Sequence, residues 1–254
     1  MKTIAIIPAR MGSTRFPGKP LEVILGMPMI GHVYKRVKLS DRLDEVYVAT
    51  CDTEIFEYIK SIGGKAIMTA DTHERCTDRT AEAIQKIKDE FGQSFDIVVM
   101  VQGDEPMVTP SMIDIAIEEM INDPGLNVVN LMTKIHIKDE FIDPNEVKVV
   151  VDLQGNALYF SREPIPSIKK SSENLNWYKQ VCIIPFRTPY LFKFNDLIPT
   201  PLEEIESVDM MRILEHGDKV RCVETDELVY SVDTLEDLRK VEEFMKNDSL
   251  LSSY

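Results

Sequence analysis

The sequence is poor in cysteine and contains no pattern that would pair its cysteines. The four cysteines are widely spaced, with no Cys-x-x-Cys pair and no histidine at zinc-finger spacing: they are Cys51, Cys76, Cys182 and Cys222. This spacing excludes a disulfide-rich scaffold and a structural zinc site. A reduced protein of the cytoplasm fits the pattern best.

Long apolar runs and biased segments are also missing. No run approaches the roughly 20 apolar residues of a membrane-spanning helix. The N-terminal stretch from Met1 to Pro8 has no secretory cleavage site. The sequence contains no internal repeat and no low-complexity tract, so we expect a soluble globular protein.

Positive charge is scarce over the chain as a whole. Lys and Arg total 29 against 43 Asp and Glu, which gives a net charge of −14 and a pI near 4.8. An acidic field repels polyanions and anionic lipids, which argues against generic nucleic-acid or membrane-surface binding. An anionic substrate is compatible with this charge only where Lys and Arg gather locally.

What the sequence does contain is an alternation of apolar strand-like runs with amphipathic helical patterns. Runs such as 4–7, 46–50 and 97–101 alternate with helical stretches up to residue 121. Strands buried on both faces predict a mostly parallel sheet between helices. We therefore expect a single α/β domain over 1–254, a three-layer α/β/α sandwich, with a small antiparallel segment at about 127–200 that forms a dimer contact.

Beyond residue 127 the pattern becomes less regular. We predict a hairpin of strands 147–151 and 157–160, followed by an excursion over 163–178 that forms a flap or a subunit contact. The remaining predicted elements are a strand over 181–184, a helix over 201–216 and a C-terminal helix over 233–246.

Cations and glycines gather in the loop that follows the first strand. Arg10, Arg15 and Lys19 lie there together with Gly12 and Gly18. Glycine lets backbone N–H groups approach an anion, while Arg and Lys supply charge and donors. The loop predicts a triphosphate site, although its spacing matches neither a Walker loop nor a dinucleotide fingerprint. A solvated basic loop is the alternative.

Two aspartates are candidates for a metal site. Asp104 follows the most apolar strand, at the sheet edge where open α/β sheets bind ligands. There it can hold a magnesium ion that bridges phosphate oxygens, whereas a turn-forming role is the alternative. Asp233 is the second candidate, but it can instead cap the next helix, because Glu236 lies three residues further on.

A polar stretch over 73–79 precedes a helix that we expect to start near Thr77. Free N–H groups at a helix start can read a base edge or bind an anion, while capping by Thr77 or Asp78 is the alternative. Apart from each other, His73 and Cys76 have no Cys or His close by in the sequence, so we assign them neither a metal nor a nucleophilic role.

Together these motifs make the chain resemble the CMP-Kdo synthetases, the 3-deoxy-manno-octulosonate (Kdo) cytidylyltransferases, over nearly its full length. The matching stretches are 7–10 through 18–20, 29–34, 77–79, 101–106, 143–145, 147–150, 157–166 and 232–238. The resemblance implies a Rossmann-like nucleotidyltransferase fold, a homodimer, Mg²⁺ as cofactor, CTP as substrate and an acidic sugar as acceptor.

The resemblance also implies roles for single residues. The nucleotide-binding set would be Ala9, Arg10, Ser13, Arg15, Lys19, Thr77 and Asp78. Asp104 and Asp233 would bind Mg²⁺, and with Arg10, Arg15 and Lys19 they would form the catalytic set. The acceptor-binding set would be Gln102, Arg162, Gln180, Ile184, Asp209 and Met210.

The sequence departs from the family pattern mainly on the acceptor side. Gln180 and Ile184 stand where the family has His and Tyr, and Asp209-Met210 stands where it has Glu-Gln. Sugar hydroxyls left unpaired against apolar groups cost about 1–3 kcal/mol each. We therefore expect Kdo to be a poor acceptor.

Two alternatives to Kdo transfer stay open. The first is CMP transfer to a different acid, namely an amino-substituted or shorter ulosonic acid or a phosphonate. The second is a non-catalytic nucleotide-binding regulator, which the presence of both Asp104 and Asp233 disfavours.

Overall fold

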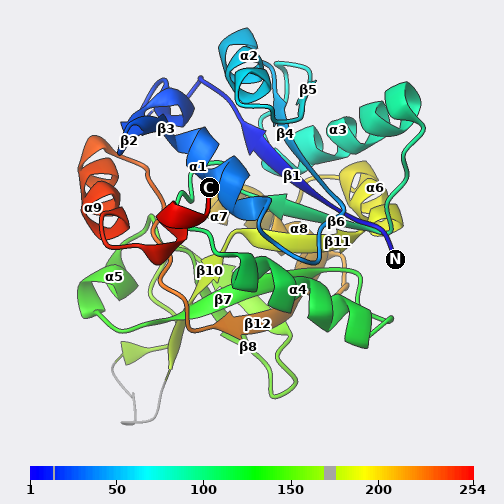
Figure 1. The fold of residues 1–254 in the computed structure, drawn as a ribbon. Coiled ribbons are helices and arrows are strands. Elements are labelled where there is room, and N and C mark those ends of the chain that lie inside the picture. The colour runs from blue at the N-terminus through cyan, green and yellow to red at the C-terminus, as the bar shows by residue number, and fades with distance from the viewer. Residues whose placement is uncertain (14, 169–175) are drawn as a thin grey trace. The chain divides into compact units, whose positions relative to one another are not determined.

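The computed structural model describes residues 1–13, 15–168 and 176–254 (Figure 1). The chain divides into two compact units: the first contains Met1–Asp114 and Leu228–Tyr254, and the second contains Ile115–Glu227. Residues 169–175 of the predicted flap lie outside the described residues. A single domain over the whole chain stays a prediction.

A parallel sheet forms the centre of the first unit. Its strands lie in the order β6 (Ile97–Val101), β1 (Thr3–Ala9), β4 (Glu45–Thr50) and β5 (Ala66–Met68), and each neighbouring pair is parallel. Every residue of β1 and β6 is buried, as in strands that are covered on both faces. The predicted α/β fold with a mostly parallel sheet is confirmed.

Helices follow these strands and pack against the sheet, namely α1 (Met29–Val37), α2 (Thr53–Ser61) and α3 (Cys76–Phe91). Gly92 ends α3 at a φ of 66°, which glycine adopts without steric cost. The unit also contains η1 (Lys19–Leu21), β2 (Val23–Ile24), β3 (Met27–Pro28), α9 (Leu235–Met245) and η3 (Ser249–Ser253). The boundary between the units falls within α4 (Pro110–Asn122).

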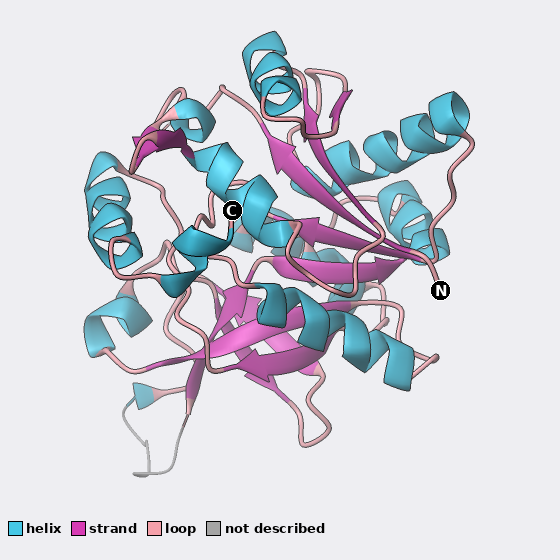
Figure 2. Cartoon of the chain, in the orientation of Figure 1, coloured by secondary structure: helices cyan, strands magenta, loops and turns pink. Residues whose placement is uncertain are grey.

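The second unit is built on a mainly antiparallel sheet, and Figure 2 shows how strand-rich this part of the chain is. The strand order is β12 (Arg221–Thr225), β7 (Val129–Ile135), β10 (Trp177–Val181), β8 (Lys148–Val151) and β9 (Ala157–Ser161). The β12–β7 pair is parallel, and the other three pairs are antiparallel. Strands β8 and β9 form the predicted hairpin.

The other elements of this unit are α5 (Lys138–Ile142), β11 (Ile183–Arg187), α6 (Thr188–Asp196), α7 (Pro201–Glu206) and α8 (Met210–Glu215). The prediction of one helix over 201–216 is wrong, because the helix is interrupted at Ser207, which has a left-handed φ of 53°. The break lets Arg212 of α8 bond Glu203 of α7 at 2.6 Å.

Two more predicted bounds need correction. The predicted strand over 181–184 spans two strands, because Cys182 separates β10 from β11. The C-terminal helix starts at Leu235 rather than at Asp233, because Thr234 is its N-cap and Asp237 completes a capping box. Among the described residues, no helix has both the length and the apolar character that crossing a bilayer requires.

Candidate functional site

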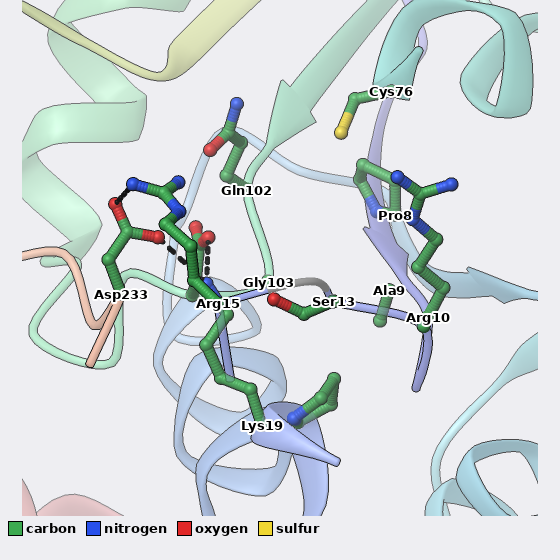
Figure 3. Close-up of a pocket in the computed structure, with 13 residues that line it drawn as sticks. Pro8, Ala9, Arg10, Ser13, Arg15, Lys19, Cys76, Gln102, Gly103 and Asp233 are labelled. Atoms are coloured by element: carbon green, nitrogen blue, oxygen red, sulfur yellow. Dashed lines mark hydrogen bonds and ion pairs between the residues drawn. The ribbon is translucent and has the colours of Figure 1, made fainter. Parts of the chain in front are cut away.

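A cavity of about 260 Å³ lies at one edge of the parallel sheet in the first unit (Figure 3). Ala9 ends β1 and Gln102 directly follows β6, so this is the carboxyl edge, where open α/β sheets bind ligands. The cavity is lined by Pro8, Ala9, Arg10, Gly12, Ser13, Arg15, Lys19, Pro20, Cys76, Gln102, Gly103, Asp104 and Asp233.

The basic loop folds back on itself between β1 and η1. The carbonyl of Met11 accepts hydrogen bonds from the N–H groups of Ser13 at 2.9 Å and Gly18 at 3.0 Å. Gly18 has a φ of 78°, a left-handed conformation that L side chains rarely adopt. The main-chain N–H of Met11 donates to Asp52 at 2.8 Å, which ties the loop to the residues that follow β4. This turn returns the chain to the cavity, so that Lys19 lies in its lining.

Lys19 lies between two carboxylates. Its Nζ is 2.7 Å from Asp104 Oδ2 and 3.2 Å from Asp233 Oδ1, and Arg15 Nη1 is 3.0 Å from Asp233 Oδ2. Burial by itself would lower the pKa of Lys19, but the charges and hydrogen bonds of the two carboxylates outweigh it and raise the pKa. Lys19 therefore stays positively charged at neutral pH.

The same two carboxylates fit a divalent cation. Asp104 Oδ1 is buried and has no hydrogen-bond partner, which costs free energy unless a ligand satisfies it. Mg²⁺ is usually held by one or two carboxylates together with substrate phosphates. Among the described residues, no three His, Cys, Asp or Glu side chains come together as a metal-binding group, so a cation here would need oxygens from the substrate.

The start of α3 forms another part of the cavity. Figure 3 shows Cys76 and Arg10 on the side opposite Asp233, and the guanidinium of Arg10 donates to the carbonyl of His73 at 3.3 Å. Thr77 is completely buried, and neither it nor Asp78 lines the cavity. Cys76 therefore lines the cavity, whereas the predicted residues Thr77 and Asp78 do not. The sequence could have indicated Cys76, because it directly precedes the predicted helix start.

Gly103 is a second lining residue to which the sequence assigned no role. A Cβ atom at this position would be 2.9 Å from the carbonyl oxygen of Pro8, which is closer than real contacts allow. Glycine is therefore required where the ends of β6 and β1 approach each other. This close approach places Gln102 and Asp104 in the same cavity as the basic loop.

Arg162, the predicted carboxylate-binding residue, lies in the second unit at the end of β9. Its Nε donates to the carbonyl of Glu206 at 2.7 Å, its Nη1 to that of Pro144 at 2.9 Å and its Nη2 to that of Ser207 at 3.5 Å. Its main-chain N–H donates to the Glu206 carboxylate at 2.9 Å. The guanidinium is thus held in place by the chain itself, which leaves part of its donor set for a ligand.

The other predicted acceptor residues of this unit differ in how much surface they offer. Gln180 is partly buried and donates to Asn130 at 2.6 Å. Asp209 is partly exposed at the start of α8. Ile184 is 2% exposed and Met210 is 0% exposed, so these two side chains have almost no surface on which a ligand could bind.

Proteins of known name are similar to this chain over nearly its whole length. The 3-deoxy-manno-octulosonate cytidylyltransferase of Geobacter metallireducens is 43% identical over 253 residues, covering 96% of this chain and 97% of that protein. The enzyme of the same name from Thermodesulfovibrio yellowstonii is 44% identical over 256 residues, covering 98% of this chain and 100% of its own.

A solved structure gives the same result. It is that of a CMP:2-keto-3-deoxy-manno-octonic acid synthetase complexed with CTP, which matches this chain with a TM-score of 0.89 and 38% identity, covering 97% of this chain and 99% of its own. A family model described as cytidylyltransferase matches residues 4–221. The chain therefore belongs to the cytidylyltransferase family.

Proposed function

We propose that this protein transfers CMP from CTP to an acidic sugar of the Kdo type and releases pyrophosphate. The observation that carries the proposal is the cavity in which Lys19 and Arg15 meet the carboxylates of Asp104 and Asp233. Polyphosphate chemistry needs cations at the phosphates and carboxylates for a metal, and both kinds of group line this one cavity. Relatives named for this reaction are 43% and 44% identical over almost the full chain.

The basic loop is assigned to the triphosphate. Arg10, Arg15 and Lys19 supply donors and positive charge where negative charge develops on the phosphate oxygens during transfer. An oxygen of the acceptor attacks the α-phosphorus in line and forms the new P–O bond, while the bond to the β-phosphate breaks. Pyrophosphate leaves, the acceptor proton passes to water, and no protein nucleophile takes part.

Asp104 and Asp233 are assigned to hold Mg²⁺. When bound there, the ion would neutralise phosphate charge and orient the α-phosphate for attack. The unpartnered Oδ1 of Asp104 supports this assignment, since a cation would satisfy it. Lys19, bonded to both carboxylates, keeps them adjacent when no metal is present.

Base recognition is assigned to the start of α3. Cys76, the first residue of α3, lies in the cavity lining, on the side away from Asp233 (Figure 3). Because Thr77 is fully buried, its side chain would act by fixing the helix start rather than by contacting cytosine. A recognition site built from main-chain groups would accept a pyrimidine and reject larger purines on size.

The acceptor is assigned to Kdo or a closely similar acid, with Gln102 of the cavity lining as a contact. The departures at Gln180, Ile184 and Met210 favoured a different acid, but the compared relatives lend that alternative no support. The buried positions of Ile184 and Met210 explain why changes there need not alter the acceptor. A homodimer and a cytoplasmic location complete the proposal and rest on the sequence resemblance and the cysteine pattern.

The test is pyrophosphate release by the purified full-length protein with CTP, Kdo and MgCl₂. We expect CTP to be used at least about 10²-fold better than ATP or GTP, and EDTA to stop the reaction. A panel with an amino-substituted ulosonic acid and a phosphonate decides the acceptor. Equal rates with all nucleotides, or release that does not require any acid, would refute the proposal.

A further inference from the structure

Asp104 and Asp233, the two aspartates assigned to the metal, are far apart in the sequence. A main-chain hydrogen bond connects the segments that carry them. The N–H of Val232 donates to the carbonyl of Asp104 at 2.9 Å, one residue away from Asp233. Val232 is fully buried in a core cluster with Ile24 and Met29, so this connection is fixed by packing. The main chain of Asp104 is therefore held next to the residue that precedes Asp233.

Asp237 holds the residues that come directly after this connection. Its Oδ2 accepts from the N–H of Asp233 at 3.2 Å, from the N–H of Thr234 at 2.9 Å and from the Thr234 hydroxyl at 2.8 Å. In return, the N–H of Asp237 donates to the Thr234 hydroxyl at 3.2 Å. The bonds with Thr234 form an ordinary capping box, but the bond to the N–H of Asp233 lies outside that motif.

With Thr234 as N-cap and Asp237 at N3, the start of α9 does not use the carboxylate of Asp233. Aspartate is itself among the best N-cap residues, so the carboxylate of Asp233 could turn back onto the free N–H groups at the helix start. Because Thr234 and Asp237 already satisfy this helix start, Asp233 is left to face the cavity, where it contacts Lys19 at 3.2 Å and Arg15 at 3.0 Å.

We propose that Asp237 is a positioning residue for the metal site: it anchors the main chain of Asp233 and keeps that carboxylate out of the helix cap. Asp237 does not line the cavity. Its effect on the metal therefore passes through Asp233, and this inference depends on the proposed function only in the assignment of Asp233 to the metal.

Three variants of the full chain test the proposal. Asp237→Ala removes the anchor and the capping box together. Asp237→Glu keeps the residue type that most capping boxes carry at this position, so the helix start stays intact, while the longer side chain moves its oxygens from the N–H of Asp233. Glu236→Ala is the matched control: it removes the same charge from the same helix turn, and Glu236 is 76% exposed and pairs with Lys240 at 2.8 Å.

The readout is the binding of Mn²⁺ in the presence of CTP, measured by electron paramagnetic resonance, beside the midpoint of thermal unfolding. We expect Asp237→Ala to weaken Mn²⁺ binding about 10-fold or more, which is the usual effect of losing a group that orients a metal ligand. Asp237→Glu should weaken it several-fold at an unchanged unfolding midpoint, and Glu236→Ala should bind Mn²⁺ within about twofold of the wild type.

The outcomes separate the two proposals. If Asp237→Glu, which keeps the helix cap, binds Mn²⁺ as tightly as the wild type, Asp237 only stabilises α9 and the inference is wrong. If Glu236→Ala weakens binding as much as Asp237→Ala, the effect is one of general charge and the inference is also wrong. A wild-type protein that binds Mn²⁺ and CTP but forms no pyrophosphate would instead refute the proposed function.

Discussion

Two cations of the first unit and two of the second differ in what their side chains contact. In the first unit, Lys19 and Arg15 line a cavity, and Arg15 is 54% exposed along its side chain. In the second unit, Arg162 donates to three main-chain carbonyls and Arg212 is paired with a carboxylate that is 1% exposed. Lys19 and Arg15 thus face a cavity, whereas Arg212 pairs within the fold and Arg162 uses part of its donor set to bind the main chain.

Lys148 of the second unit also binds the main chain. Lys148 is fully buried and donates to the carbonyls of Asp143, Glu146 and Arg162 at 2.6–2.7 Å, and burial lowers its pKa. Its three donors are all satisfied by the chain, so it has none left for a substrate. Lys148 therefore ties the end of β9 to the residues before β8, whereas Lys19 of the first unit lines a cavity.

We expect the largest loss of stability from Arg212→Met. The change leaves Glu203, which accepts two bonds of 2.6 Å from Arg212, buried without a counter-charge. Removing one partner of a buried ion pair costs about 3–5 kcal/mol. Urea unfolding should show this loss in the free energy of unfolding. A variant that unfolds at the wild-type midpoint but loses acceptor binding would place Arg212 in the site rather than in the fold.

Asp104→Asn should instead lower turnover while the protein stays folded. Losing this carboxylate removes preorganised charge from the cavity, and turnover should fall about 10²–10³-fold. Because Asp233 still bonds Lys19 at 3.2 Å, we expect the variant to stay folded. Steady-state kinetics at saturating CTP and Mg²⁺ measure the loss. Glu243→Gln, at a side chain that is 69% exposed, is the control and should keep wild-type turnover. Wild-type rates in Asp104→Asn would remove it from the catalytic set.

The parallel sheet and the position of the cavity were predictable because their signals are local. The apolar run 97–101 matches β6 residue for residue, since a strand buried on both faces carries one unbroken pattern. The cations of the first loop follow directly after β1, and the carboxyl edge of a parallel sheet gathers such loops. Sequence order and strand direction therefore sufficed to bring Lys19 and Asp104 together.

Other features of the fold and of the site depend on contacts that no local sequence pattern encodes. The break at Ser207 accompanies the pairing of Glu203 with Arg212 across it, and a helical pattern of 16 positions does not reveal such a break. The helix α6 (Thr188–Asp196) was not predicted; it has Pro189 in its first turn, where proline is well tolerated. The role of Asp233 was ambiguous because the capping box is shifted by one residue from the expected one.

A smaller effect is expected from Ile184→Tyr, which restores the family residue at a position that this chain buries. Ile184 is 2% exposed, so the larger ring must be forced into a packed interior, at a cost of about 1–3 kcal/mol. Thermal unfolding measures that cost, and the KM for Kdo should change less than the stability does. Gln180→His, at a partly exposed position, serves as the comparison. A stable Ile184→Tyr variant with a lowered KM for Kdo would show instead that this position lines the acceptor site.

The smallest effect concerns acid pH and the loop beside Arg10. Glu82 accepts bonds from the N–H of Ala70 at 2.9 Å, from Lys86 at 2.9 Å and from His73, whose carbonyl in turn accepts from Arg10 at 3.3 Å. Burial alone would raise the pKa of Glu82, but these bonds outweigh it and lower the pKa to about 2.

A carboxyl group whose pKa is lowered by folding stabilises the folded state above its ordinary pKa of about 4.5. That contribution is lost as the pH falls toward about 2. Urea unfolding of the wild type and of Glu82→Gln should therefore differ at pH 6 and converge as the pH approaches 2. Because Gln keeps an acceptor but loses the charge, the KM for CTP should rise only a few-fold. If the difference in unfolding free energy between the wild type and Glu82→Gln stays constant across this pH range, the ionised Glu82 does not organise the loop beside the cavity.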